Sequence, residues 1–145
     1  MMIQKIYLAD DDLEDQELFK NALQQIPFSP ELFLFKDGLE LMDDLFSNQP
    51  LPDAIFLDLY MPIMNGFDCL YDIRNFRQFS DIDIIVYSTT YVKREVKQLK
   101  KDGANQFMQK PNSFEQLVDI LSKSLEQVEE NLKQKSRKRR FVEFI

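Results

Sequence analysis

The sequence predicts an α/β fold made of five strand-helix repeats, (βα)5. Short apolar runs alternate along the chain with longer stretches in which apolar residues recur with a helical period. Three of the five apolar runs are nearly continuous, as expected of parallel strands that helices cover on both faces. Because connections between parallel strands are right-handed, we expect the repeats to fold as a doubly wound five-stranded parallel sheet.

The predicted strands are the five short apolar runs, at residues 5–9, 31–35, 54–58, 83–88 and 105–109. The first helix follows Asp12, whose side chain can cap it, and it ends before Pro27. Its apolar residues form one stripe, made of Leu18, Phe19, Ala22, Leu23 and Ile26. Later helices are predicted at residues 38–47, 66–76, 92–102 and 113–134.

The helix predicted at 113–134 has the best-marked start. Ser113 and Gln116 have the spacing of a capping box, and Pro111 stands just before them. Apolar residues follow at helical spacings, and they are Phe114, Leu117, Leu121, Leu125, Val128 and Leu132. This extended last helix is longer than one layer of core requires. It either overhangs the domain or offers a seam to a second copy or another partner, and with fewer than three clean heptads both alternatives stay open.

Length and composition fit one globular domain, because 145 residues with 44% apolar and 30% charged side chains can enclose a single core. No apolar run is long enough to span a membrane, and the N-terminus turns acidic where a signal peptide would stay apolar. We therefore expect a cytoplasmic protein that does not associate with membranes. The chain has no histidine, which excludes Ser-His and Cys-His nucleophile pairs and a phosphohistidine of its own.

Basic charge is concentrated near the C-terminus. Residues 133–140, KQKSRKRR, hold six of the 18 basic residues and no acid, which leaves 12 basic and 24 acidic residues in 1–132, a net charge of −12. We expect a domain at 1–132 and a solvated or loosely ordered basic tail at 133–145. The alternative is an arm that touches an acidic surface, another protomer or nucleic acid. Direct DNA binding is not expected of so acidic a domain.

Polar residues follow four of the predicted strands at the point where each strand ends. The acidic run that starts with Asp10 and Asp11 follows the first strand, and Asp58 ends the third. Ser88 ends the fourth strand and Lys110 follows the fifth. In doubly wound sheets, ligands bind at the carboxyl ends of the strands, beside the point where the strand order reverses. We therefore predict that these side chains share one site.

The residue types at this edge predict a metal and a reaction. Carboxylates gathered at one place repel one another unless a cation joins them, and a small set of oxygen ligands suits Mg²⁺. A carboxylate beside such an ion, with a lysine ammonium and a hydroxyl across from it, fits phosphoryl transfer, because the positive charges neutralise the phosphoryl oxygens while the carboxylate attacks. Asp58 is the predicted nucleophile, and Lys110 and Ser88 are its predicted catalytic partners.

With these residues in place, the chain resembles the receiver domain of two-component response regulators, a CheY-like family, over residues 3–130. The resemblance implies a flavodoxin-like fold with strand order 2-1-3-4-5. It implies that Asp10, Asp11 and Asp58 bind Mg²⁺, with Asp11 as the direct ligand of the acidic pair, together with the backbone carbonyl of Tyr60. It also implies that Asp58 is the phosphoacceptor.

The resemblance further implies a switch. Ser88, thirty residues after Asp58, matches the switch hydroxyl, and Phe107, three residues before the lysine, matches the aromatic residue that changes rotamer with it. Lys110 and Pro111 match a Lys-Pro pair that commonly has a cis peptide in this family. Phe107 stands where tyrosine is commoner, so its movement must rely on packing. Ser88 replaces threonine and keeps the hydroxyl.

The segment that follows the predicted phosphoacceptor contains two residues that are typical of turns. Pro62 has a fixed φ and Gly66 has unusual backbone freedom. We expect both to shape the loop that leads from the third strand into the next helix. Ordinary turn punctuation is the simpler interpretation, and it is compatible with that role.

The resemblance implies a single-domain response regulator that accepts a phosphoryl group on Asp58 from a phosphohistidine of a separate sensor kinase or phosphotransfer protein. Phosphorylation would reshape the face made by 92–102, 105–109 and 113–134, and the signal would pass to an unidentified downstream protein or through a homodimer. One alternative is a Mg²⁺-dependent phosphohydrolase with an aspartyl nucleophile, although such enzymes usually carry a second aspartate where this chain has Tyr60. Another is a phosphorylation-independent binding module with a receiver fold, which would have no need to bind Mg²⁺.

Overall fold

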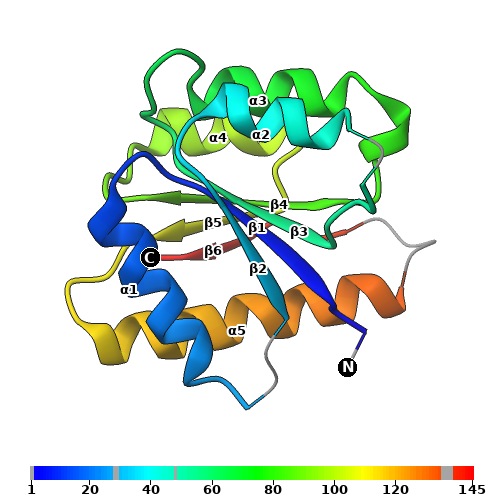
Figure 1. Ribbon diagram of the computed structural model, residues 1–145. Coiled ribbons are helices and arrows are strands. Elements are labelled where there is room, and N and C mark those ends of the chain that lie inside the picture. Colours follow the sequence, from blue (N-terminus) through cyan, green and yellow to red (C-terminus); the bar gives the residue numbers. More distant parts are fainter. Residues whose placement is uncertain (1, 28–29, 48, 135–138) are drawn as a thin grey trace.

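The computed structural model describes residues 2–27, 30–47, 49–134 and 139–145. Within these residues, helices alternate with strands along almost the whole chain (Figure 1). The strands are β1 Lys5–Ala9, β2 Glu31–Phe35, β3 Ala54–Leu57, β4 Asp83–Ser88, β5 Gln106–Gln109 and β6 Val142–Phe144. The helices are α1 Leu13–Gln24, α2 Gly38–Leu45, α3 Gly66–Arg74, α4 Lys93–Lys101 and α5 Phe114–Lys133, with a short 3-10 turn at Arg77–Phe79.

All strand pairs in the sheet are parallel, and the spatial order is β2-β1-β3-β4-β5-β6. The predicted order 2-1-3-4-5 and the doubly wound topology are therefore confirmed. The chain starts in the middle of the sheet and winds first to one side and then to the other, so the strand order reverses between β1 and β3. This is the position where sheets of this kind place their ligands.

Two helical layers cover the sheet. In Figure 1, α1 and α5 lie on one face, and α2, α3 and α4 lie on the other. Each layer has its own apolar core. Phe19, Leu23 and Leu121 belong to the core under α1 and α5, whereas Leu41 and Leu70 belong to the core under α2, α3 and α4. Strands β1, β3 and β4 contribute to both cores, which explains why their sequences are apolar at nearly every position.

Helices α1, α2, α3 and α5 begin at polar side chains that accept hydrogen bonds from their first turns, whereas α4 follows Val92 and has no side-chain cap. The predicted cap Asp12 accepts from the backbone N–H groups of Glu14 and Asp15, and Ser113 accepts from that of Gln116. Two apolar residues that we placed in buried stripes are exposed instead, because they lie at the margin of the packed face. Leu18 in α1 is 44% exposed, and Phe114, the first residue of α5, is 39% exposed.

A sixth strand extends the predicted five-stranded sheet. Residues 142–144, in the segment expected to be a loosely ordered tail, form β6 beside β5, with Val142 paired with Gln106 and α5 as the crossover. Arg139 forms an ion pair with the buried carboxylate of Asp83. The rest of the basic run, residues 135–138, lies outside the described residues. Because β6 pairs with the backbone of β5, that strand is not left as a sheet edge.

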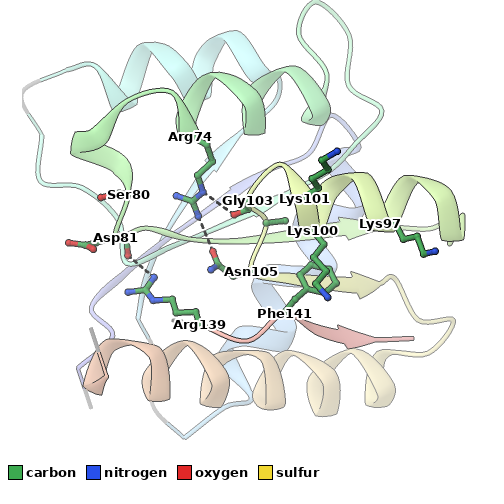
Figure 2. Close-up of a pocket in the computed structure, with 11 residues that line it drawn as sticks. Arg74, Ser80, Asp81, Lys97, Lys100, Lys101, Gly103, Asn105, Arg139 and Phe141 are labelled. Carbon is green, nitrogen blue, oxygen red and sulfur yellow. Dashed lines mark hydrogen bonds between the residues drawn. The ribbon is translucent and has the colours of Figure 1, made fainter. Parts of the chain in front are cut away.

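A half-buried arginine ties the loops at the amino ends of β4 and β5 together (Figure 2). The guanidinium of Arg74, at the end of α3, donates to the carbonyl oxygens of Gly103, Phe79 and Ile82 and to the side-chain oxygen of Asn105, at 2.8 to 3.0 Å. Burial lowers the pKa of Arg74 to about 10, which leaves it protonated at neutral pH. Its fork of donors thus joins the end of α3 to three backbone carbonyls and to the Asn105 side chain.

No helix within the described residues combines the length and the apolar composition that a membrane crossing needs.

Replacement of Arg74 by lysine should lower the free energy of unfolding by roughly 2–4 kcal/mol, because an ammonium cannot bond all four oxygens and leaves some of them unsatisfied. Denaturant unfolding followed by far-UV circular dichroism measures this change. The matched control is Arg77→Lys, an exposed arginine in the adjacent 3-10 turn. It should change stability by less than about 0.5 kcal/mol. Equal effects of the two substitutions would contradict the role given to Arg74.

Candidate functional site

The candidate site lies at the carboxyl edge of the sheet, where the chain leaves β1, β3, β4 and β5. Ala9 pairs with Leu57, so Asp10 and Asp58 leave neighbouring strands at the same level. The backbone N–H of Asp58 donates to the carbonyl oxygen of Ala9 at 3.0 Å, which fixes the two aspartates side by side. The backbone N–H of Lys110 donates to the carbonyl oxygen of Ser88 at 2.8 Å, and this bond aligns the ends of β4 and β5 in the same way.

Three carboxylates form the centre of the site. One oxygen from each of Asp10, Asp11 and Asp58 lies within 4.8 Å of the others. Asp10 is fully buried and Asp58 is 8% exposed, whereas Asp11 faces solvent. The structure therefore brings together the three carboxylates that the sequence predicts as metal ligands. Because Asp11 is exposed while Asp10 and Asp58 are buried, an ion can reach the cluster from solvent on the side of Asp11.

Lys110 lies against these carboxylates, as predicted, but its closest partners differ from the expectation. Its Nζ donates to Asp10 Oδ2 and to Asp15 Oδ2, both at 2.8 Å, and lies 3.7 Å from Asp58 Oδ2. Asp15, in the first turn of α1, was not predicted as a site residue. Its signal in the sequence was weak, since an acid in the first turn of a helix is ordinarily explained by the helix dipole.

The electrostatics of the two buried carboxylates are dominated by burial. Burial raises the pKa of Asp58 to about 7; Lys110 lowers it and the neighbouring Asp10 raises it further. The pKa of Asp10 is also raised, by burial first, although its hydrogen bond to Lys110 acts in the opposite direction. Burial alone would lower the pKa of Lys110, but the hydrogen bonds to Asp10 and Asp15 raise it above its ordinary value. Lys110 is therefore a permanent cation in this site.

The two predicted switch residues are buried beside the site. Ser88, the last residue of β4, is fully buried, and its Oγ accepts a hydrogen bond from the backbone N–H of Thr90 at 3.3 Å. Phe107 in β5 is 1% exposed. Its ring meets that of Tyr91 edge to face, with centroids 5.6 Å apart, and the Tyr91 hydroxyl donates to Glu143 in β6 at 3.1 Å. Tyr91 and Glu143 were not predicted as neighbours of the switch.

The loop between β3 and α3 is held close under Asp58. The N–H of Gly66 donates to the carbonyl oxygen of Leu59 at 2.8 Å, and a Cβ added at Gly66 would lie 2.3 Å from the carbonyl oxygen of Asp58. Only glycine fits there, which agrees with its predicted role in shaping the loop. Pro62 is exposed in the same loop, and its carbonyl oxygen accepts from the N–H of Met64 at 2.7 Å.

Tyr60 and Pro111 flank the site. The Tyr60 side chain is exposed, and its hydroxyl donates to Glu95 in α4 at 2.8 Å. The predicted metal ligand is the backbone carbonyl of this residue. The peptide bond between Lys110 and Pro111 is trans, as are all the peptide bonds of the described residues. The cis peptide implied by the family resemblance is therefore not present here: the chain enters the β5–α5 turn with the ordinary bond geometry.

A cavity of about 640 Å³ lies elsewhere in the molecule, where β4 and β5 begin. Its walls include Arg74, three lysines of α4, and Arg139 and Phe141 of the C-terminal segment (Figure 2). Because the strands are parallel, this cavity and the acidic cluster lie at opposite edges of the sheet. The predicted site residues therefore lie at the carboxyl ends of the strands, and this cavity lies at their amino ends.

Comparison with known proteins agrees with this geometry. The family model for the response regulator receiver domain matches residues 6–122. Relatives include the response regulator Rcp1 of Synechocystis, 26% identical over 80% of this chain and 82% of Rcp1, and the chemotaxis protein CheY1 of Helicobacter pylori, 29% identical over 74% of this chain and 85% of CheY1. Other relatives are longer: this chain spans 15% of the sensor histidine kinase CheAY of Helicobacter pylori and 51% of the response regulator DctR of Bacillus subtilis.

Solved structures give the same result. The phosphorylated cyanobacterial phytochrome response regulator RcpA superposes with a TM-score of 0.79 at 27% identity, over 86% of this chain and 92% of RcpA. The bacteriophytochrome response regulator RtBRR superposes with a TM-score of 0.71 at 28% identity, over 83% of this chain and 77% of RtBRR. With the matched family model and the strand order, these likenesses show that the chain belongs to the response regulator receiver domain family.

Proposed function

We propose that this domain accepts a phosphoryl group on Asp58 from a phosphohistidine of a separate kinase or relay protein. The observation that carries the proposal is the convergence on Asp58 of the acidic cluster and of Lys110, whose Nζ lies 3.7 Å from Asp58 Oδ2. Receiver domains in general have a histidine kinase partner. These 145 residues contain no histidine, so the donor imidazole lies outside them. The phosphorylated structure of the relative RcpA supports the same chemistry here.

Asp58 acts as the nucleophile in this proposal. One carboxylate oxygen attacks the phosphorus, an O–P bond forms, and the P–N bond breaks with its electron pair returning to the imidazole nitrogen. Lys110 brings a permanent positive charge to the side of Asp58 where the phosphoryl oxygens arrive. Ser88 ends the strand next to β3 and can offer its hydroxyl hydrogen to one of those oxygens. Asp58 must be ionised to attack, and added positive charge nearby favours that form.

The acidic cluster fits a divalent cation. Three carboxylates with oxygens within 4.8 Å carry more negative charge than Lys110 alone compensates, and two of them are buried. An all-oxygen set with one ligand open to solvent suits Mg²⁺, which keeps several of its waters. Asp10, Asp11, Asp58 and the backbone carbonyl of Tyr60 would hold it. When bound, Mg²⁺ supplies positive charge that offsets the charge of the phosphoryl oxygens.

The proposed output is a change in protein contacts. A phosphoryl group on Asp58 gives Ser88 a new acceptor, and Ser88 would leave its hydrogen bond with Thr90 to reach it. The space that Ser88 vacates adjoins β5, where Phe107 packs against Tyr91. A shift of these two rings changes the face formed by α4, β5 and α5, and a downstream protein or a second copy of the chain would read that change.

The phosphohydrolase alternative has less support. Its acid/base aspartate would stand at position 60, where the tyrosine hydroxyl is turned toward Glu95 of α4. The binding-module alternative does not account for two buried carboxylates placed beside each other, because that arrangement costs free energy unless a cation is to be held there.

Intact mass spectrometry after incubation with acetyl phosphate and Mg²⁺ tests the proposed function. We expect one added phosphoryl group on the parent protein, none on Asp58→Asn, and none when a chelator removes the metal. Asp43→Asn, an exposed aspartate of α2, is the matched control and should behave like the parent. Uptake by Asp58→Asn at the parent rate would show that another residue is the nucleophile.

The raised pKa of Asp58 predicts a pH-dependent gain of stability in Asp58→Asn when no metal is present. An unfolded aspartate ionises near pH 4, whereas folded Asp58 ionises near pH 7, so its carboxylate increasingly destabilises the fold as pH rises between these values. The neutral amide should therefore stabilise the protein little at pH 4.5 and by about 1 kcal/mol at pH 8, after allowance for screening by water. Denaturant unfolding in chelator measures this. A gain that is equal at both pH values would contradict the raised pKa.

Removal of the Ser88 hydroxyl should separate phosphoryl uptake from signalling. We expect Ser88→Ala to accept a phosphoryl group, because Asp58, Lys110 and the acidic cluster remain. The phosphorylation-induced changes in the amide chemical shifts of Tyr91 and Phe107 should fall by roughly half or more, since Ser88 no longer moves toward the phosphoryl group. Two-dimensional NMR measures these shifts. Thr89→Ala, the exposed neighbouring hydroxyl, is the control, and full changes in Ser88→Ala would refute the switch.

A further inference from the structure

Lys110 is held more closely by two other carboxylates than by the proposed nucleophile. Its ammonium donates hydrogen bonds at 2.8 Å to both Asp10 and Asp15, while Asp58 Oδ2 lies at 3.7 Å, beyond hydrogen-bond distance. The Tyr87 ring lies 5.0 Å from the same ammonium group and contributes a cation-π contact. In this state, the hydrogen bonds of Lys110 to carboxylates are directed away from Asp58.

Asp15 differs from the other two carboxylates around Lys110. Asp10 and Asp58 belong to the acidic cluster, whereas Asp15 does not. Asp15 lies in the first turn of α1, where its backbone N–H donates to the Asp12 side chain at 3.2 Å. Its position is thus fixed by the start of the helix, and it has no other described salt bridge than the one with Lys110. Among the described residues, Lys110 is therefore the only cation that pairs with the Asp15 carboxylate.

A first-turn acid can stabilise a helix through its dipole, and this is the simplest explanation of Asp15. Glu14, in the same turn, offers that stabilisation while facing solvent and forms no salt bridge among the described residues. The helix dipole does not fully explain Asp15, because its carboxylate also forms an ion pair with Lys110, whose side chain is only 8% exposed. An ion pair shielded from water in this way is stronger than one on the surface.

We propose that Asp15 is a positioning residue that holds Lys110 away from Asp58 and thereby slows phosphoryl transfer to Asp58. The inference rests on the proposed function. Lys110 must loosen its contact with Asp15 to meet phosphoryl oxygens on Asp58, so the two acceptors compete for one ammonium group. The negative charge of Asp15 also repels an incoming phosphoryl donor. Both effects act in the same direction, and Asp15 sets the threshold for activation of the domain.

Asp15→Asn should accelerate phosphorylation by acetyl phosphate, at saturating Mg²⁺, by about threefold or more, which corresponds to about 0.65 kcal/mol of barrier. Intact mass spectrometry on quenched time courses measures the rate, and the dependence on donor concentration shows whether the half-saturating concentration falls. Glu14→Gln is the matched control, because it removes one negative charge from the same helical turn without touching Lys110. Asp15→Glu, which retains a carboxylate, should return the rate toward that of the parent.

A double-mutant cycle shows whether Asp15 acts through Lys110. In a Lys110→Ala background, Asp15→Asn should accelerate phosphorylation no more than Glu14→Gln does, because the ammonium that Asp15 restrains is gone and only the loss of one negative charge remains. An equal acceleration with and without Lys110 would refute the positioning role and leave only charge repulsion of the donor. No acceleration in the parent background, beyond that of Glu14→Gln, would refute the whole inference about Asp15 while leaving the proposed function intact.

Side-chain NMR of Lys110 tests the contact independently of phosphorylation. The ammonium signal, assigned by its loss in Lys110→Arg, should exchange slowly with water in the parent and in Glu14→Gln, and faster in Asp15→Asn. If the parent takes up no phosphoryl group although this signature is present, the proposed function fails and the inference fails with it. If the parent is phosphorylated but the signature is the same in all three proteins, Asp15 does not hold Lys110.

Discussion

Asp10 and Asp58 share a site because Ala9 pairs with Leu57, so that the chain leaves β1 and β3 at the same level. A slip of one residue would turn every side chain of a strand to the opposite face and would separate the two carboxylates. Once the register is set, two buried acids lie side by side, and their repulsion must be offset. Lys110 does this from the end of β5, at the same edge of the sheet. Its backbone N–H bonds to the carbonyl oxygen of Ser88, which aligns the end of β5 with the end of β4. Backbone pairing thus sets where the chain places Asp10, Asp58 and Lys110.

The same pairing connects the site to the C-terminal segment. Phe107 lies in β5, whose neighbours are β4 on one side and β6 on the other. Tyr91 covers the Phe107 ring and hydrogen-bonds to Glu143 of β6. Any movement of Phe107 is therefore opposed by an aromatic contact and by a strand that the last residues of the chain supply. In the proposed switch, this packing takes the place of the hydrogen bond that a tyrosine at position 107 would make.

Most of the fold was predictable from the sequence, because parallel strands buried on both faces leave nearly continuous apolar runs. The caps Asp12 and Ser113 were predictable because each is a capping residue type that stands just before a helical period. The cluster of Asp10, Asp11 and Asp58 was predictable because these acids follow the ends of two predicted strands. The strand β6 could not be predicted, since three residues after a basic run carry no periodic signal and form a strand only because β5 offers them an edge. Asp15 was missed for a related reason: its contact with Lys110 depends on the angle at which α1 leaves β1, which no local pattern encodes.

The pairing of β6 with β5 has a consequence for shortened forms of the chain. Removal of residues 139–145 would expose the N–H and C=O groups along one side of β5, an open edge to which a strand from another molecule can add. It would also take Arg139 away from Asp83 and leave Asn131 as the described side-chain partner of that buried carboxylate. A chain cut after α5 would thus have a less stable β4 and an unpaired β5 edge that can bind a strand of another molecule. Self-association of such a shortened protein would result from the cut and not from the signalling state of the domain.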